Sequence, residues 1–143
     1  MNLSQAQAAE IAALLNARNQ LTVQYTGKKV LDHADDYLFR LSPAQKVVAC
    51  IEVKKVQWYQ AEVLHLTVAE GEKGKGYAKA LLSSAETRAR EKSVRVLQCT
   101  IREGNVQSEG LFQAAGFLKA STFHNEHSGN NVGVYQKVLV HAR

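Results

Sequence analysis

The stretch EKGKGYAKALL, residues 72–82, places two glycines one residue apart among lysines and continues directly into helix-forming residues. It follows YQAEVLHLTV, residues 59–68, a run rich in β-forming residues that predicts a strand. The first main-chain N–H groups of a helix have no partner within the helix, and glycine lets an anion approach them closely. A strand, a glycine turn and a helix in this order predict a phosphate-binding turn.

Two well-known phosphate signatures do not fit this turn. The P-loop requires a lysine and a serine or threonine after its last glycine, but Tyr77 and Ala78 follow Gly76. The dinucleotide fingerprint requires a third glycine where this chain has Lys79, and no parallel β-α-β half-fold precedes it. A glycine turn before a helix can also be a tight connection that binds nothing.

Length and composition predict an ordinary globular chain. Its 143 residues fit one domain over 1–143, and the 45% hydrophobic and 22% charged residues are typical of soluble proteins. No apolar run is long enough to cross a bilayer, so we expect no membrane partner. Met1–Glu10 lacks a cationic start followed by an apolar core, which favours a cytoplasmic location. Cys50 and Cys99 lie in strand-like runs and are expected to be buried free thiols.

The basic charge favours an anionic ligand. The formal net charge is +5 and the isoelectric point is about 9.3. Most lysines and arginines are scattered through several segments instead of forming one stripe, which is typical of solvated surface charge. A small basic RNA-binding module is therefore the weakest of our hypotheses, and nucleic acid is not an expected partner.

Hydrophobic periodicity predicts a mixed α/β (α+β) chain. The expected helices run from a cap at Ser4 to about residue 19, through part of 26–36, from 77 to 92, and from Asn105 or Ser108 to Gly116. The expected extended segments are 21–25, 37–41, 47–53, 59–68, 94–101, 117–123 and 132–140. Segments 37–68 form an antiparallel meander, 94–101 pairs in parallel after a helical crossover, and the chain ends in a hairpin.

Two separated motifs resemble one family. Lys73–Ala78 reads KGKGYA and is similar to the acyl-CoA signature [QR]-x-x-G-x-[GA], with lysine in place of arginine or glutamine, and Val68 stands five residues before it. NVQSEGLFQAAGF, residues 105–117, is similar to a second element of the GCN5-related N-acetyltransferase (GNAT) family. The resemblance covers roughly 37–139. It implies one domain with a central, mixed, mostly antiparallel sheet of about six to seven strands, flanked by about four helices.

The resemblance implies acetyl-CoA (coenzyme A) as cofactor and an amine of a small molecule, peptide or protein as acceptor. It places the pyrophosphate on the main-chain N–H groups of the turn and the pantetheine arm on the backbone of the preceding strand. The implied cofactor-binding residues are Leu66, Val68, Lys73, Gly74, Lys75, Gly76, Tyr77, Ala78, Asn105 and Ser108.

The resemblance also places a catalytic glutamate at Glu62, six residues before Val68. The alternative is an exposed strand carboxylate that pairs with Lys54 or Lys55. His65 is the second candidate base, because its ordinary pKa of about 6.5 suits proton transfer and a strand bulge could turn it toward the acceptor. A histidine that is simply satisfied among apolar neighbours is the alternative for His65.

One departure from the family pattern bears on chemistry. The family often uses a tyrosine to protonate the leaving thiolate, and this chain has Phe112 there, so Tyr135 or water would have to substitute. This departure keeps open a second hypothesis, a non-catalytic acyl-CoA sensor. His124 and His127 lack the further ligands that a metal site needs, so no metal is expected. The exposed last hairpin allows a homodimer.

Overall fold

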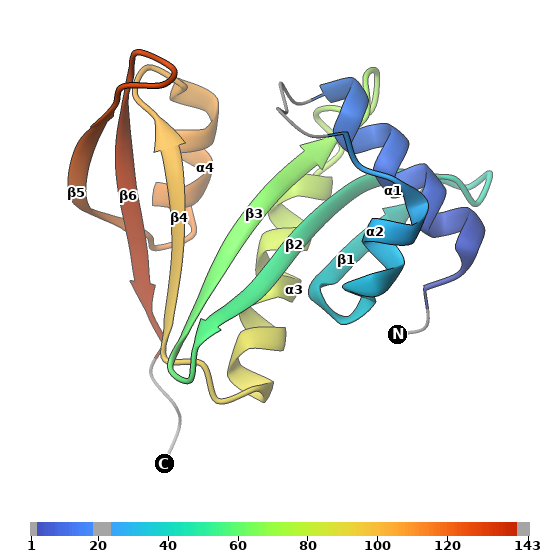
Figure 1. Ribbon diagram of the computed structural model, residues 1–143, viewed down its shortest axis with the longest axis horizontal. Helices are drawn as coiled ribbons and strands as arrows, with labels where there is room; N and C mark the ends of the chain where they lie inside the picture. The colour runs from blue at the N-terminus through green and yellow to red at the C-terminus, as the bar shows by residue number, and fades with distance from the viewer. Residues whose placement is uncertain (1–2, 19–23, 140–143) are drawn as a thin grey trace. The chain divides into compact units, whose positions relative to one another are not determined.

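The structure is a computed structural model that describes residues 3–18 and 24–139. Within these ranges no helix is long and apolar enough to cross a membrane. Figure 1 shows the order of the elements along the chain. They are α1 (Gln5–Arg18), α2 (Gly27–Asp32), a 3-10 turn (Ala34–Asp36), β1 (Tyr37–Leu41), β2 (Val47–Gln57), β3 (Gln60–Val68), α3 (Tyr77–Glu91), β4 (Val96–Arg102), α4 (Val106–Ala114), β5 (Leu118–Asn125) and β6 (Asn130–Val138).

The strands form one six-stranded sheet in the order β1-β2-β3-β4-β6-β5. The pairs β1–β2, β4–β6 and β5–β6 are antiparallel, whereas β3 pairs in parallel with β4. The parallel ladder joins the first residues of the two strands, from Gln60 opposite Val96 to Glu62 opposite Gln98. The predicted mixed, mostly antiparallel sheet and the parallel crossover after α3 are confirmed.

The chain divides into two compact units. Unit 1 comprises Met1–Lys54 and Leu64–Ala85, and unit 2 comprises Lys55–Val63 and Glu86–Arg143, in each case as far as the structure describes them. β3 and α3 therefore contribute residues to both units. The single domain over 1–143 stays a prediction.

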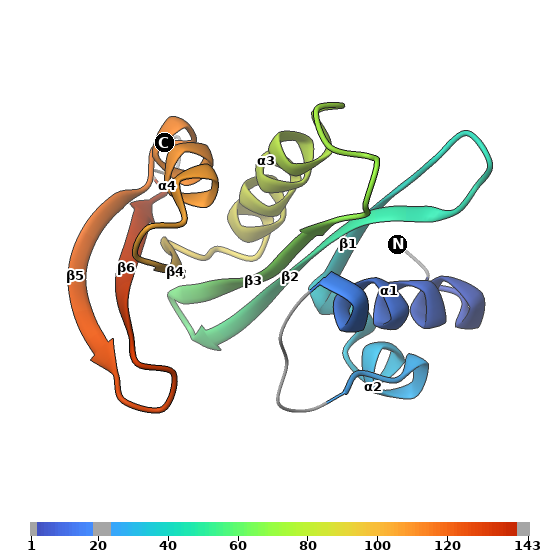
Figure 2. The same cartoon turned by 90° about the horizontal axis from the view of Figure 1, so that it is seen from above.

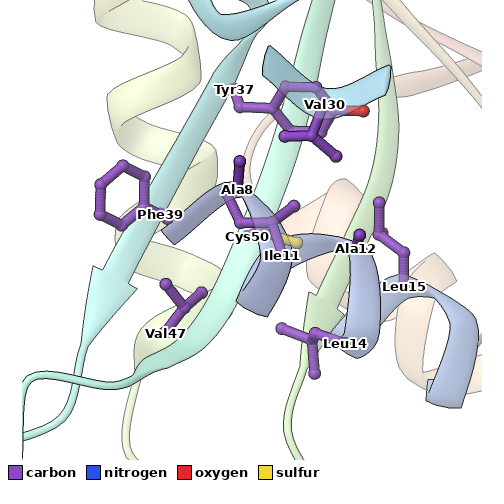
Figure 3. Close-up of a cluster of buried hydrophobic side chains, with 10 residues drawn as sticks. All are labelled: Ala8, Ile11, Ala12, Leu14, Leu15, Val30, Tyr37, Phe39, Val47 and Cys50. Atoms are coloured by element: carbon purple, nitrogen blue, oxygen red, sulfur yellow. The ribbon is translucent and has the colours of Figure 1, made fainter. Parts of the chain in front are cut away.

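In unit 1, α1 and α2 cover one face of β1 and β2, and the first turns of α3 cover the other (Figure 2). Helix α1 begins with a reciprocal cap, in which Gln7 N donates to Ser4 Oγ and Ser4 N donates to Gln7 Oε1, each at 3.1 Å. Its buried face packs on the strands together with Val30 of α2 (Figure 3). The cluster consists of Ala8, Ile11, Ala12, Leu14, Leu15, Val30, Tyr37, Phe39, Val47 and Cys50.

In unit 2, α4 packs through two aromatic rings. Phe112 and Phe117 are buried and meet edge to face, with ring centroids 5.1 Å apart. Helix α4 is capped by Asn105, whose Oδ1 accepts from Ser108 N at 3.3 Å. It ends just before Gly116, whose φ of 95° is the left-handed conformation expected of a residue beyond a helix end.

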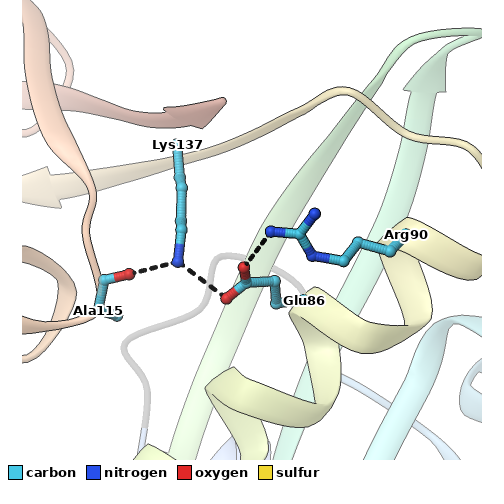
Figure 4. Close-up of polar contacts among 4 residues, drawn as sticks. All are labelled: Glu86, Arg90, Ala115 and Lys137. Carbon is cyan, nitrogen blue, oxygen red and sulfur yellow. Dashed lines mark hydrogen bonds and ion pairs between the residues drawn. The ribbon is translucent and has the colours of Figure 1, made fainter. Parts of the chain in front are cut away.

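A second contact in unit 2 joins α3, α4 and β6 through charge (Figure 4). Lys137 Nζ donates to Glu86 Oε2 at 2.9 Å and to the main-chain oxygen of Ala115 at 2.8 Å. Arg90 Nη2 donates to Glu86 Oε1 at 2.8 Å. Burial by itself would raise the pKa of Glu86, but the hydrogen bonds from Lys137 and Arg90 outweigh it and lower that pKa.

The predicted elements agree with the structure except in detail. Helix α1 ends at Arg18, and Asn105 is the cap of α4. The short helix expected in part of 26–36 is α2, which the 3-10 turn follows. The expected extended segment 21–25 lies largely outside the described residues. Ala78, which the helical spacing of α3 predicts to be buried, is only half-buried because it lies in the first turn of α3.

The turn between β3 and α3 depends on left-handed glycines. Gly71, Gly74 and Gly76 have φ angles of 82°, 81° and 81°. Apart from the two chain neighbours of each glycine, no atom of the described residues lies within 4 Å of a Cβ built on any of the three. The space next to these glycines is therefore open, and a side chain would not be excluded by crowding. Glycine is required here only because of the positive φ angles.

We expect Gly76→Ala to lower the free energy of unfolding by about 1–2 kcal/mol, because an L side chain is strained at positive φ. The matched control is Gly110→Ala in α4, which also adds a methyl group to open space but at ordinary helical φ. That control should gain about 0.5–1 kcal/mol. Urea unfolding measures both, and equal shifts would contradict the analysis.

We expect Glu86→Gln to lower the free energy of unfolding by about 1–3 kcal/mol at pH 7, because two charged hydrogen bonds are lost. The lowered pKa of Glu86 gives a pH dependence. Its contribution to stability is complete above the unfolded pKa of about 4.3 and is lost as pH falls through the lower folded value. The difference between wild type and variant should therefore shrink in acid.

Urea unfolding at several pH values measures this difference. The control is Asp32→Asn, which breaks an exposed ion pair between Lys28 and Asp32. That pair should contribute less than about 0.5 kcal/mol at any pH. A Glu86→Gln effect that is no larger than the control, or that grows in acid, would contradict this interpretation.

Candidate active site

The turn of unit 1 presents main-chain donors to solvent. The first i to i−4 bond at the start of α3 runs from Ala80 N to the oxygen of Gly76, at 3.0 Å. Within the described part of the chain, the N–H groups of Gly76, Tyr77, Ala78 and Lys79 have no hydrogen-bond acceptor. Since these groups also lie at the positive end of the helix dipole, the turn can bind an anion.

Three lysines accompany these donors. Lys75 Nζ forms an ion pair with Glu72 Oε2 at 2.7 Å, and this partner raises the pKa of Lys75. Lys73 and Lys79 are exposed and form no ion pair with any residue that the structure describes. Lys73 and Lys79 can therefore add positive charge to the turn without first breaking a contact.

Strand β3 contains one irregular backbone conformation before it reaches this turn. His65 has a φ of 53°, which is outside the extended region, and its main-chain oxygen accepts from Thr67 Oγ1 at 2.8 Å. A bulge at His65 stays a prediction, because the positive φ alone does not establish an extra residue in the strand. Leu66 and Val68, the two residues predicted to contact a cofactor through their backbone, follow the irregularity and are half-buried. They lie in unit 1 together with Lys73–Ala78.

The side chain of His65 faces Tyr25. The Tyr25 hydroxyl lies 3.0 Å from His65 Nε2, and the two rings meet edge to face with centroids 5.5 Å apart. Burial lowers the pKa of His65, so the imidazole is neutral at pH 7 and can accept a proton. Tyr25 is itself held by Asn16 of α1, which bonds its main-chain N–H and oxygen at 2.8 and 2.9 Å.

Behind Tyr25 lies a buried acid that the sequence analysis missed. Glu52 of β2 is 8% exposed and stands directly across from Tyr37 of β1, which is 4% exposed. The Tyr37 hydroxyl interacts with both the Glu52 carboxylate and Tyr25. Burial raises the pKa of Glu52 despite this contact with Tyr37. The signal was present in the sequence, because Glu52 is the one charged residue of the apolar run VVACIEV, residues 47–53.

The other predicted base, Glu62, lies in unit 2 and is held by amides. Its Oε1 accepts from Gln98 Nε2 at 2.6 Å and from Gln60 Nε2 at 3.4 Å. Gln136 Nε2 in turn donates to Gln98 Oε1 at 2.6 Å, so one row of side chains crosses β3, β4 and β6. Burial raises the pKa of Glu62 although both amides oppose the shift. The alternative of an exposed carboxylate paired with Lys54 or Lys55 was wrong, because Glu62 faces the glutamines.

The remaining predicted residues also lie in unit 2. Asn105 and Ser108 form the cap of α4, so the Asn105 side-chain oxygen already has a local role. Phe112 is buried against Phe117 and offers no acidic proton. Tyr135, the suggested substitute, is 1% exposed, and its hydroxyl donates to Glu109 Oε2 at 3.3 Å.

In the part of the chain that the structure describes, no three histidine, cysteine, aspartate or glutamate residues lie together in a group that could hold a metal ion. His124 Nδ1 lies 2.8 Å from Asn131 Oδ1 across the exposed β5–β6 hairpin. Cys50 and Cys99 are buried free thiols. Burial raises the pKa of each thiol to about 12, so neither is a reactive thiolate near neutral pH.

Solved structures share this fold. Ard1 from Thermoplasma volcanium superposes with a TM-score of 0.81 at 19% identity, covering 99% of this chain and 97% of the other. The ribosomal-protein-alanine N-acetyltransferase from Brucella melitensis gives 0.84 at 19% identity, covering 97% and 98%. Rv2747 from Mycobacterium tuberculosis, solved in complex with CoA and NLQ, gives 0.79 at 13% identity, covering 98% of each chain.

At the level of sequence, a comparison with curated proteins gives no match. A family model described as Acetyltransferase (GNAT) family matches residues 6–117, which is most of the chain. The matched range contains β3, the glycine turn, α3 and α4. The chain therefore belongs to the GNAT acetyltransferase family.

Proposed function

We propose that this chain transfers an acetyl group from acetyl-CoA to a primary amine. The observation that supports this most is the turn of Lys73–Ala78, where left-handed glycines leave main-chain N–H groups without acceptors at the start of α3. Membership in the GNAT family and the CoA that Rv2747 binds agree with the same cofactor. The acceptor is an amine of a small molecule, peptide or protein.

The residues of the turn fit a pyrophosphate. Apart from its chain neighbours, a Cβ built on Gly74 or Gly76 meets nothing within 4 Å, so the open space next to the backbone can take phosphate oxygens. The N–H groups of Gly76, Tyr77 and Ala78 can donate to those oxygens, and the ammonium groups of Lys73 and Lys75 supply charge. Lysine offers a point charge where arginine would offer a planar fork, so orientation depends chiefly on the backbone.

The bound cofactor would supply an acyl thioester, which is already activated toward amines. In unit 1, the backbone of Leu66 and Val68 would hold the pantetheine arm beyond the irregular conformation at His65. In unit 2, we retain Asn105 and Ser108 as predicted cofactor contacts.

The acceptor amine must lose a proton before it can attack, because a lysine-like amine has a pKa of about 10.4. Glu62 and His65 both suit this task. Burial raises the pKa of Glu62, which makes its carboxylate a stronger base, and burial lowers the pKa of His65, which favours the neutral imidazole that can accept a proton. The fixed carboxylate of Glu62, held by two amides, and the family resemblance favour it as the first candidate.

A non-catalytic acyl-CoA sensor is the second candidate function, because Phe112 cannot protonate a leaving thiolate. A thiolate leaves readily, so the loss of one acid is expected to slow acetyl transfer by about 10² without abolishing it. Acetyl-CoA binding without product from any amine of a broad panel would favour the sensor.

Calorimetry with acetyl-CoA and an assay of free thiol release across that panel test the proposal directly. We expect binding, and release that depends on one class of amine. Lys73→Ala should weaken acetyl-CoA about tenfold, because it removes one charge from the turn. The control, Lys92→Ala, removes the same charge from an exposed position in unit 2 and should leave affinity unchanged. Equal effects of both variants would argue against a site at the turn.

Glu62→Gln should lower kcat by about 10²–10⁴ and leave acetyl-CoA affinity unchanged, because it removes a base and keeps the shape. Wild-type activity should fall as pH drops through the raised pKa of Glu62, since only the carboxylate accepts a proton. Glu91→Gln on exposed surface is the control. Equal losses of affinity and turnover would speak against a base role, and a full loss in His65→Gln alone would transfer that role to His65.

A further inference from the structure

A row of polar side chains crosses the strands of unit 2 and begins at Glu62, the first candidate base. The strand register places Glu62 of β3 beside Gln98 of β4, which stands opposite Gln136 of β6. Gln136 in turn stands opposite Leu118 of β5. Partners in neighbouring strands share one face of a sheet. We call Glu62, Gln98 and Gln136 the amide row. Its members are half-buried, whereas Leu118 at its end is 76% exposed.

The amide row lies on the face of β4 and β6 that the described helical residues of unit 2 leave uncovered. The alternate residues of these strands point to the other face, where Cys99 is buried and the Tyr135 hydroxyl donates to Glu109 of α4. Figure 2 shows α4 on one side of β4, β5 and β6. Within unit 2, the carboxylate of Glu62 therefore stands at the open face of the sheet.

Hydrogen-bond chemistry fixes the direction of the amide row. The Glu62 carboxylate can only accept, so Gln98 must present its Nε2 group, which donates to Glu62 Oε1 at 2.6 Å. This orientation turns Gln98 Oε1 toward β6, where Gln136 Nε2 donates to it at 2.6 Å. A flipped Gln98 amide would place oxygen against oxygen at Glu62 and would leave the Gln136 Nε2 group facing a nitrogen. The two contacts therefore favour the same orientation of Gln98.

The two oxygens of Glu62 have different surroundings. Oε1 accepts from Gln98 and, at 3.4 Å, from Gln60 Nε2. Among the described residues, no donor contacts Oε2 and no cation forms an ion pair with the carboxylate. Oε1 is thus the anchored oxygen, and Oε2 is the oxygen that can accept a proton at the open face.

We propose that Gln98, oriented by Gln136, is a positioning residue that anchors Glu62 through Oε1 and leaves Oε2 to accept the proton of the acceptor amine. This inference rests on the proposed acetyl transfer and on Glu62 as its base. It adds one residue of β4 and one of β6 to a step for which sequence reasoning named only Glu62 and His65.

The proton transfer breaks one bond and forms one. The N–H bond of the acceptor ammonium breaks, an O–H bond forms at Glu62 Oε2, and a neutral amine results. Oε1 keeps the hydrogen bond from Gln98 throughout, so the carboxyl group does not have to move. Water then takes the proton from the carboxylic acid. A neutral amide suits this role, because a cation in the same place would stabilise the carboxylate so strongly that it became a poor base.

The titratable groups around Glu62 have to be included in any pH analysis. The charged residues of the strands beside it in unit 2 are Lys55 of β2, Arg102 of β4 and Lys137 of β6. Within the described ranges none of them forms an ion pair with Glu62, and Lys137 is engaged on the opposite face. The Cys99 thiol, whose pKa is raised to about 12 by burial and by Glu62, stays neutral near pH 7. Burial and the two contacting amides therefore govern the titration of Glu62.

The test combines a ¹³C NMR titration of the side-chain carboxyl groups of the full chain with a pH profile of activity. The Glu62 signal is assigned from its loss in Glu62→Gln. Gln98→Met removes the donor but keeps a side chain of similar length, so the pKa of Glu62 should rise further and the acidic limb of activity should move to higher pH. The unanchored carboxylate should also lower kcat about tenfold and leave acetyl-CoA affinity unchanged.

Gln98→Lys should move the titration in the opposite direction. A charged donor in place of a neutral one lowers the pKa of Glu62, so the acidic limb should shift to lower pH. The carboxylate becomes a weaker base, so kcat should fall in this variant too. Damage to the fold alone would not give shifts of opposite sign in two variants of one residue.

Two further variants separate the amide row from its strand. Gln136→Leu leaves the Gln98 amide free to flip, so it should reproduce the shift of Gln98→Met in smaller measure. The matched control is Thr100→Val, which removes a polar group from the next position on the same face of β4. That control should leave the Glu62 signal and kcat unchanged.

An unchanged Glu62 titration or an unchanged kcat in Gln98→Met overturns the inference, and so do shifts of the same sign in Gln98→Met and Gln98→Lys. If Gln98→Met fails to fold, Gln98→Lys and Gln136→Leu still decide the question. Failure of the proposed function is distinct, because it would show as absent acetyl-CoA binding or absent acetyl transfer in the wild type. The carboxyl titration needs neither cofactor nor turnover, so it tests the anchoring of Glu62 in either case.

Discussion

The fold depends on how the chain turns from β3 into α3. Three residues of this turn require positive φ, which only glycine adopts without strain, and the first N–H groups of α3 remain without acceptors among the described residues. Most proteins satisfy a helix start with a side-chain cap, as this chain does at α1 and α4. This contrast within one molecule is part of the reason why we propose the start of α3 as the binding site for the pyrophosphate of acetyl-CoA.

The buried Glu52 and the half-buried Glu62 are stabilised by different kinds of hydrogen-bond donor. Glu62 in unit 2 is surrounded by neutral amides, which stabilise the charged form without neutralising it. Glu52 in unit 1 is contacted by the Tyr37 hydroxyl, and Tyr37 also contacts Tyr25, whose hydroxyl lies 3.0 Å from His65 Nε2. In both cases burial raises the pKa and hydrogen-bond donors oppose the rise. Each arrangement holds a carboxylate in place, and each carboxylate also acts on other titratable side chains, Glu62 on Cys99 and Glu52 on Tyr25, Tyr37 and Cys50.

The sequence predicted the elements well because their signals are local. Strand β1 and the cap at Asn105 follow from apolar spacing and from turn chemistry within a few residues. The partners of the candidate bases could not be predicted in the same way. Contact between Tyr25 and His65, or between Glu62 and Gln98, depends on strand register and on the path of α1 and α2, which no local pattern encodes. The charged residue in the run 47–53 was a visible signal that sequence reasoning passed over.

The ion pair between Lys137 and Glu86 also makes the lysines of this chain unequal toward acylating reagents. Acetylation removes the charge of a lysine and two of its protons. At an exposed position such as Lys92 this changes little beyond the surface charge. At Lys137 acetylation would disrupt the hydrogen bonds to Glu86 and to the main-chain oxygen of Ala115. A thioester that acetylated this amine would therefore destabilise unit 2. The two engaged hydrogen bonds and the limited exposure of the side chain, 23%, protect Lys137 against that damage.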